Sequence, residues 1–302
     1  MILEIDKPMR VYHSDGSAPE AVRFGFAFTH PQLQIEGNPC ALVVVEDLAR
    51  NLDPPQSHVT YCLTSPAVPN KKTMPDYVVQ CFTPEQQSIE CCGHGLLLAA
   101  WHWLVESKQS ELRLVMNDSS VRAFLEGSND ELAVEGPRVC LQFSDIVMTP
   151  VTVPLKLIDE IGLSKNSLPI SAAHVGDEQG YLVLQFADNT ELKKLPKPKQ
   201  SISKFTQRAI IYTAAQPEHG AEAISLRYFA PQYGVDEDGA TGSAMRVLAR
   251  FWSARFDKLH AIQASEAGGQ LFSELVGDDI IVKGYCHWFE QGDWIDQSDW
   301  GD

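Results

Sequence analysis

The sequence predicts an α+β protein made of two similar barrel-like domains, each a mainly antiparallel sheet wrapped around a central helix. Three observations support this fold class. Ten short β-rich runs are spread along the 302 residues, a length sufficient for two medium domains. Only two segments have the length and composition of long helices. The turn in front of each of these helices belongs to a pattern that occurs twice in the chain.

The predicted strands are short runs rich in β-branched and aromatic residues, bounded by turn-forming residues. In order along the chain they cover residues 22–28, 41–47, 59–65, 76–82, 112–118, 139–147, 180–186, 209–215, 224–230 and 278–285.

The two long helices are predicted at residues 93–106 and 243–256. The first is apolar on nearly every face, so we expect strands to surround it. The second is more amphipathic and carries three arginines. Shorter helices are expected at 154–163 and 190–195. The residues of the first helix that should be buried are Leu96, Leu97, Leu98, Trp101 and Leu104.

The polar segment 126–136 is the best candidate for a crossing between the halves, which predicts a first domain at 1–127 and a second at 128–302. The last strands of the second domain are able to return to the first. In the repeated pattern, a Phe-x-Pro motif precedes a glycine-rich turn and a helix in both halves, at Phe82 and at Phe229. Cys92 then aligns with Gly239, two residues after Glu90 and Glu237 respectively.

The two helix starts are the predicted functional elements. A helix N-terminus has unpaired N–H groups and a partial positive charge, and glycines beside it admit a ligand to the backbone. Two such ends at one cleft would hold a carboxylate or a developing enolate, which suits removal of a proton next to a carboxylate.

Composition excludes several other classes of function. A formal net charge of −16 argues against nucleic acid and anionic membranes as partners, and no segment approaches a membrane-spanning length. Together with the absence of a signal-like start and of a disulfide pattern among seven cysteines, this predicts a cytoplasmic protein. Neither metal-ligand spacing nor a Gly-x-Gly-x-x-Gly motif is present, so no metal and no cofactor is expected.

Three segments in the right order resemble the signature segments of the phenazine-biosynthesis PhzF-like isomerases, which share the diaminopimelate epimerase fold. These segments are IEGNPCALVVVEDL, FTPEQQSIECCGHG and RYFAPQYGVDEDGATGSA, at residues 35–48, 82–95 and 227–244. The resemblance runs from about residue 22 to near the C-terminus and leaves about twenty N-terminal residues outside. It implies an active site between the two domains, a carboxylated small-molecule substrate and, as in many members, a homodimer.

The resemblance also implies the site residues. Asp238 and His94 would be catalytic. Gly93, Gly242 and Ser243 would bind the substrate, and Asn38 and Cys92 are further substrate-binding candidates from the sequence. Histidine and carboxylate side chains are the usual proton carriers near neutral pH. A turn around Gly93 and Gly242 would offer backbone N–H groups to an anion.

The chain departs from the family pattern at the acid–base glutamate, because His58 occupies its place. A neutral imidazole can act as a base near pH 7, so His58 is a third catalytic candidate. The connection from Asn38 to this site is several residues shorter than usual, and one extra residue separates Pro84 from the turn at Cys92.

Cys92 has two interpretations. In the two-thiol racemases of this fold, a cysteine precedes the glycine at both helix starts, whereas the repeat places Gly239 at the second position here. A symmetric two-thiol racemase is therefore not expected. Cys92 is either a thiol with a lowered pKa in the field of the helix or a small buried packing residue.

Two functional hypotheses follow from the sequence. The first is a cofactor-independent isomerase or epimerase in which Asp238 and either His58 or His94 exchange a proton next to a carboxylate. The alternative is a family member that kept the fold and the cleft, lost catalysis with the missing glutamate, and binds a small carboxylate or a protein partner.

Overall fold

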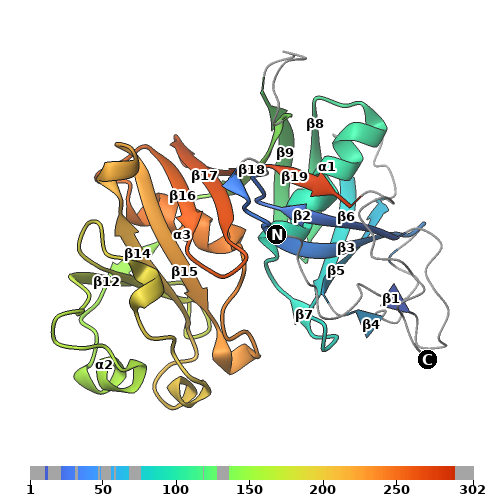
Figure 1. The fold of residues 1–302 in the computed structure, drawn as a ribbon. Coiled ribbons are helices and arrows are strands. Elements are labelled where there is room, and N and C mark those ends of the chain that lie inside the picture. Colours follow the sequence, from blue (N-terminus) through green and yellow to red (C-terminus); the bar gives the residue numbers. More distant parts are fainter. Residues whose placement is uncertain are drawn as a thin grey trace.

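A computed structural model describes residues 11–12, 22–30, 33–46, 48, 56–57, 59–67, 76–117, 119–127 and 136–289 (Figure 1). The first half contains one long helix, α1 (Gly93–Ser107). Its strands are β1 (Val11–Tyr12), β2 (Val22–Ala27), β3 (Asn38–Val44), β4 (Gln56–Ser57), β5 (Thr60–Pro66), β6 (Asp76–Phe82), β7 (Ser88–Ile89), β8 (Glu111–Met116) and β9 (Ser119–Glu126).

The second half contains α2 (Leu155–Ile161) and α3 (Gly242–Phe251). Its strands are β10 (Arg138–Ser144), β11 (Met148–Pro150), β12 (Ser171–Val175), β13 (Tyr181–Gln185), β14 (Ala209–Ala215), β15 (Ala223–Phe229), β16 (Lys258–Gln263), β17 (Gly269–Val276), β18 (Asp279–Gly284) and β19 (Cys286–Trp288). The short helical turns are η3 (Leu192–Lys194), η4 (Gln200–Lys204), η5 (Pro217–His219) and η6 (Pro231–Tyr233).

The two halves repeat one order of strand pairings. In the first, β2 is antiparallel to β3, β3 parallel to β5, β5 antiparallel to β6, β6 parallel to β8 and β8 antiparallel to β9. The series from β12 to β17 has the same directions in the same order. The long helices occupy equivalent places in the chain: α1 lies between β6 and β8, and α3 lies between β15 and β16 (Figure 1). This repetition supports the internal duplication predicted from the sequence.

Two strands connect the halves. β10 pairs with β9 on one side and with β18 on the other. β19 returns to the first half, where Trp288 lies opposite Gly25 of β2. The predicted boundary after residue 127 borders residues outside the described part of the chain, so the division into domains at 1–127 and 128–302 stays a prediction.

The α1 helix forms the centre of the first half. Leu96, Leu97, Leu98 and Leu104 are at most 2% exposed, as predicted. Trp101 differs from the prediction, because it is only partly buried. Its ring stacks on Trp288 with the centroids 4.9 Å apart, so β19 covers one face of the indole. Trp101 therefore lies at the edge of the part of α1 that the strands cover.

The second half shows where the predictions failed. Strands β12, β16 and β17 were missed, as was β9 in the first half, because alternating polar residues such as those of Lys258–Gln263 dilute the apolar signal. The helix predicted to reach residue 256 ends at Phe251. Beyond it the N–H groups of Ser253 and Arg255 bond the carbonyls three residues before them, which is the pattern of tighter turns. The segment 190–195 contains only the short turn η3. No helix in the described ranges is long and apolar enough to cross a membrane.

We predict that Leu97→Ala lowers the free energy of unfolding by about 2 to 5 kcal/mol, because Leu97 is fully buried where α1 meets the surrounding strands. Urea denaturation measures the loss. Val105→Ala on the same helix is the matched control, since Val105 is 53% exposed and should change stability by about 0.5 kcal/mol or less. Equal losses in the two variants would contradict the central position of α1.

Candidate active site

The N-termini of α1 and α3 are in direct backbone contact. A Cβ atom on Gly93 would lie 2.7 Å from Cα of Gly242, and one on Gly242 would lie 2.8 Å from the ring of Phe28. Only glycine at both positions permits this approach. Two positive helix ends therefore meet at one place, with Phe28 closing one side.

This contact corrects the predicted alignment of the repeats. The residue before Gly242 is Thr241, which is the N-cap of α3, as Cys92 is the N-cap of α1. Cys92 thus corresponds to Thr241 and not to Gly239, because the second half has two more residues between its strand and its helix. The expectation that only one of the two helix starts carries a thiol is unchanged, because the N-cap of α3 is a threonine.

Asp238 lies in the turn before α3 with hydrogen bonds to both carboxylate oxygens. Nδ2 of Asn38 donates to Oδ1 at 2.8 Å, and the hydroxyl of Thr241 donates to Oδ2 at 2.5 Å. The side chain is half-buried. A carboxylate that accepts such bonds is fixed in orientation and keeps lone pairs for a further contact.

Asn38 connects the two halves at the site. It is the first residue of β3 and follows Gly37, whose φ of +80° and whose closeness to the carbonyl of Ala27 exclude a side chain. Nδ2 of Asn38 donates to the carboxylate of Asp238 and also to the backbone carbonyl of Ala240, at 2.9 Å. His94 is the third neighbour, with Nδ1 at 3.3 Å. Since Nδ2 faces that nitrogen and has no lone pair to accept a proton, we assign the neutral tautomer of His94 with hydrogen on Nε2.

His94 is buried in the first turn of α1 and is coupled to Cys92. Burial lowers the pKa of His94, whereas negative charge on Cys92 and then on Asp238 raises it, with a net upward direction. The upward direction depends on an ionised Cys92. Because the pKa of Cys92 lies well above its ordinary value, the sulfur is neutral near pH 7, and we expect a neutral imidazole there.

The thiol of Cys92 belongs to a buried group of cysteines. A hydrogen bond with Cys81 raises its pKa most, and burial adds to this effect. Cys81 also interacts with Cys62, its partner across β5 and β6, and Cys40 lies close by. The sulfur of Cys92 is 3.7 and 3.8 Å from the two ring nitrogens of His94, so it lies on the axis of neither N–H bond. The structure favours the packing interpretation of Cys92.

Ser243 lies in the first turn of α3, where sequence reasoning had placed it, and three neighbours were missed. Its hydroxyl acts on the pKa of Tyr181 of β13, so the two side chains lie close together. The ring of Tyr228 on β15 lies 6.4 Å from that of Tyr181 and is coupled electrostatically to Asp238. Cys91 influences both tyrosines. Tyr228 stands in the signature segment 227–244, so the sequence did hold a signal for it, whereas Tyr181 resembles an ordinary aromatic residue of a strand.

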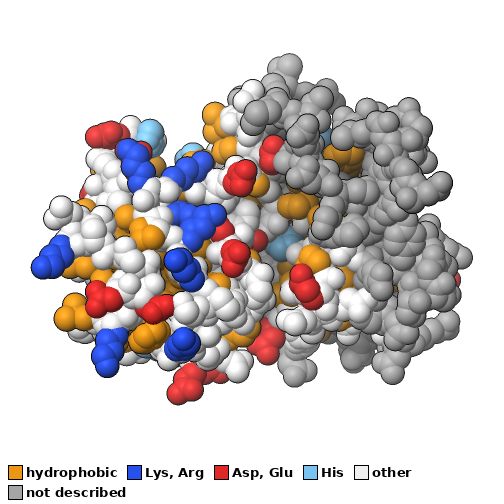
Figure 2. Space-filling model, turned by 60° about the horizontal axis from the view of Figure 1, so that its bottom comes forward, with side chains coloured by type: hydrophobic (Ala, Val, Ile, Leu, Met, Phe, Trp, Pro, Cys, Tyr) orange, Lys and Arg blue, Asp and Glu red, His pale blue; other side chains and the backbone are white. Residues whose placement is uncertain are grey.

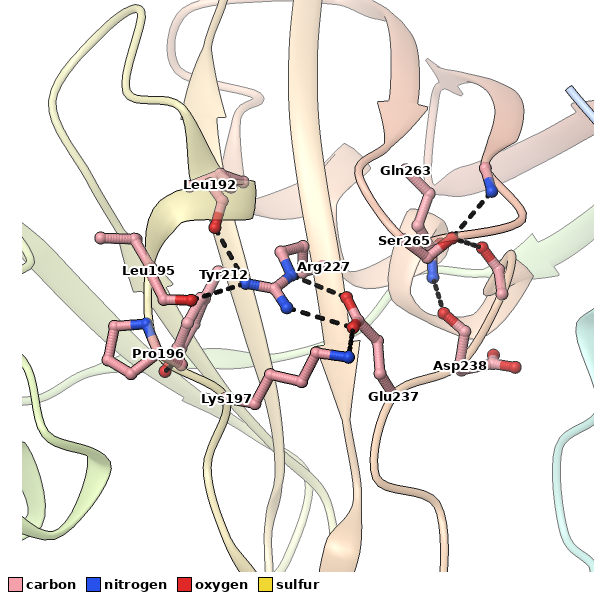
Figure 3. A network of polar contacts seen from close by, with 12 residues as sticks. Leu192, Leu195, Pro196, Lys197, Tyr212, Arg227, Glu237, Asp238, Gln263 and Ser265 are labelled. Carbon is pink, nitrogen blue, oxygen red and sulfur yellow. Dashed lines mark hydrogen bonds and ion pairs between the residues drawn. The ribbon is translucent and has the colours of Figure 1, made fainter. Parts of the chain in front are cut away.

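Glu237 is directed away from Asp238 into a buried ion pair (Figure 3). Nε and Nη2 of Arg227 donate to its two oxygens at 2.6 and 3.1 Å, and Lys197 adds a contact at 2.6 Å. Arg227 also donates to the carbonyls of Leu192 and Leu195 at 2.9 Å each. Burial raises the pKa of Glu237, but the bonds from Arg227 and Lys197 outweigh it and hold the pKa below its ordinary value.

Two side chains hold the other side of the turn (Figure 3). Gln263 donates to the carbonyl of Asp238 at 2.7 Å and accepts from the N–H of Thr241 at 2.8 Å. Ser265 donates to the carbonyl of Gly239 at 2.6 Å. The backbone around Asp238 is therefore fixed from β16 and the segment after it, as well as through Glu237.

The structure brings together Asn38, Cys92, Gly93, His94, Asp238, Gly242 and Ser243. His58 lies outside the described residues, so its catalytic role stays a prediction. In the described part of the chain, no group of three His, Cys, Asp or Glu side chains is arranged to bind a metal ion. Figure 2 shows one face with a hollow between the halves, where histidine surface lies among acidic and apolar side chains.

Comparison with known proteins shows the family. Residues 27–276 match the family model of the phenazine biosynthesis-like proteins (PhzC-PhzF), so the chain belongs to this family. It has the diaminopimelate epimerase-like fold predicted from the sequence. A crystal structure of a PhzF-family protein from Enterococcus faecalis matches with a TM-score of 0.66 at 22% identity, covering 89% of this chain and 96% of that one.

Two curated relatives from Pseudomonas aeruginosa are named uncharacterized isomerases. One is 26% identical over 223 residues, which cover 72% of this chain and 77% of the relative. The other is 30% identical over 213 residues, covering 69% and 74%. These names support the prediction that the chain is an isomerase.

We predict that Gly93→Ala destabilises the protein by about 1 to 3 kcal/mol, because the new methyl group would meet the backbone of Gly242. Thermal and urea unfolding measure this loss. Gly239→Ala is the matched control, since its Cβ would be 3.5 Å or more from the nearest atom, and it should stay within about 0.5 kcal/mol of the unmodified protein. A Gly93→Ala variant of full stability would show that the helix starts are not in contact.

For Cys92 we predict slow alkylation at pH 7 and an apparent pKa above about 8.5, because the hydrogen bond with Cys81 and burial both oppose the thiolate. The measurement is the pH dependence of iodoacetamide labelling of Cys92, followed by peptide mass spectrometry in a Cys91→Ser background. Adding Cys81→Ala should lower this pKa. A value below that of a free thiol would restore Cys92 as a reactive group.

Proposed function

We propose that the protein is a cofactor-independent isomerase that moves a proton next to the carboxylate of a small-molecule acid. The observation that carries this proposal is the arrangement of Asp238 and His94 on either side of Asn38, beside two helix starts in contact. Each half supplies one proton carrier. The meeting of the halves is therefore what would create the reaction site.

The chemistry that the residues support is a two-step proton transfer. One group, Asp238 or His94, takes the proton from the carbon next to the carboxylate, and the electron pair of the broken C–H bond moves into that carboxylate. The N–H groups at Gly93 and Gly242 and the hydroxyl of Ser243 would stabilise the extra negative charge. The other group then gives a proton to a carbon of the same system. His58 is a third candidate carrier from the sequence, in the place of the family glutamate.

We expect Asp238→Asn and His94→Gln each to reduce catalysed proton exchange by about 10² to 10⁴-fold, because each removes a proton carrier while keeping a similar shape. The assay incubates the protein with a panel of small carboxylic acids in D₂O and detects deuterium on carbon by NMR and mass spectrometry. Asp236→Asn is the matched control, because Asp236 is an exposed residue of the same loop. His58→Ala tests the third candidate in the same assay.

The outcomes separate the isomerase from the alternative of a family member that only binds small carboxylates. A binding protein would retain its ligand and leave every carbon-bound proton unexchanged. Full exchange activity in both Asp238→Asn and His94→Gln would remove the proposed mechanism even if the protein proved to be an isomerase.

A further inference from the structure

Arg246 lies one turn into α3, on the helix face that begins at the site. It follows Gly242 by four residues and Ser243 by three, the spacings at which helical side chains share a face. Long helical side chains lean toward the N-terminus of their helix, which directs Arg246 toward Ser243. Its electrostatic influence on both Tyr181 and Cys91 agrees with this direction.

The guanidinium of Arg246 has unused hydrogen-bonding capacity. Nη2 donates to the carbonyl of Ser144 at 2.8 Å, and the group lies 5.2 Å from the centre of the Phe143 ring. Nε is buried without a hydrogen-bond partner. No carboxylate among the described residues forms an ion pair with Arg246, whereas Arg250, one turn further along, has Asp145 at 3.6 Å. A buried guanidinium N–H without a partner is costly unless a ligand or water satisfies it.

Tyr181 lies close enough to both Ser243 and Arg246 for each of them to act on its pKa. Burial raises the pKa of Tyr181 to about 12, so its hydroxyl stays protonated and can donate near neutral pH. Ser243 lies close to it and supplies a second hydroxyl. Tyr228 continues the series toward Asp238. Polar donors thus lie near a positive charge. The exposed carboxylate of Glu90 also acts on Tyr181 and Cys91.

We propose that Arg246, with the hydroxyls of Tyr181 and Ser243, forms a second anion subsite beside the reaction centre, and that the substrate is a small acid with two anionic groups. This inference rests on the proposed function, in which the helix starts hold the carboxylate next to the reacting carbon. Arg246 then binds the second anionic group through charge-assisted hydrogen bonds. The subsite selects the substrate and takes no part in proton transfer.

The test compares small diacids with their monoamides, which have the same shape and one charge fewer. The probes are succinate, glutarate and phthalate, each with its monoamide, and titration calorimetry and ligand-observed NMR give the dissociation constants. We expect at least one diacid to bind the unmodified protein about tenfold or more tightly than its monoamide. Arg246→Gln should abolish this preference, and Arg246→Lys should retain part of it through the charge.

Arg250→Gln is the matched control, because it removes the same charge from the same helix at an exposed position. It should keep the preference for the diacid. Arg246 could serve only as a link from α3 to Ser144; in that case Arg246→Gln would lower stability and leave the ratio of diacid to monoamide affinities unchanged. That result, or the absence of any diacid preference in the unmodified protein, would overturn the proposal.

The same samples in D₂O separate this inference from the proposed function. A diacid that binds through Arg246 without deuterium exchange would support the subsite and count against the isomerase mechanism. Exchange into a diacid that is equally fast in Arg246→Gln at subsaturating diacid concentration would support the isomerase and overturn the subsite.

Discussion

The contact between Gly93 and Gly242 is the constraint on which the rest of the site depends. It places two helix N-termini against each other, and like partial charges do not favour such an arrangement. The nearby carboxylate of Asp238 offsets part of that charge, and an anionic ligand would offset more. The arrangement therefore costs some stability in the absence of an anion and gains it on binding, which is typical of a site organised before its ligand arrives.

The turn that carries Asp238 is held more firmly than its length suggests. Glu237 on one side is fixed by Arg227 and Lys197, and Gln263 and Ser265 bind the backbone on the other. A buried ion pair of this kind adds little net stability, but removing one partner costs about 3 to 5 kcal/mol because the other is left unpaired. The ion pair of Glu237 instead fixes the position of the turn that carries Asp238. Of the two neighbouring acids, Glu237 is a structural anchor and Asp238 is the carboxylate of the candidate site.

The sequence predicted those parts of the fold that depend on local pattern. The apolar helix at Gly93, ten strands and the two glycine-rich helix starts were visible because burial on all sides, β-branched runs and turn chemistry leave direct traces in the residues. Strands such as Lys258–Gln263 were missed, since one face of the sheet is polar there. The register of the repeats was wrong by two residues at the second helix, because nothing in the sequence shows which residue caps α3.

The site was predicted as far as motifs reach. Asp238, His94 and Asn38 stand in signature segments, and the structure brings them within hydrogen-bonding distance of one another through Asn38. Tyr181 comes from a strand far away in the sequence. The relation of Tyr181, Tyr228 and Gln263 to Asp238 exists only after the sheet has formed. The separate roles of Glu237 and Asp238 could not be predicted either, because they depend on the position of Arg227.

The return of β19 to the first half has a consequence for the synthesis of the chain. Residues 286–288 pair with β2 about 260 positions earlier, so β2 keeps an unpaired edge until nearly all of the described chain has left the ribosome. Trp288 also lies against Gly25 and Trp101, and these surfaces stay uncovered for the same time. An exposed strand edge beside uncovered aromatic rings is a template for wrong pairing. The first half is thus made first and completed last.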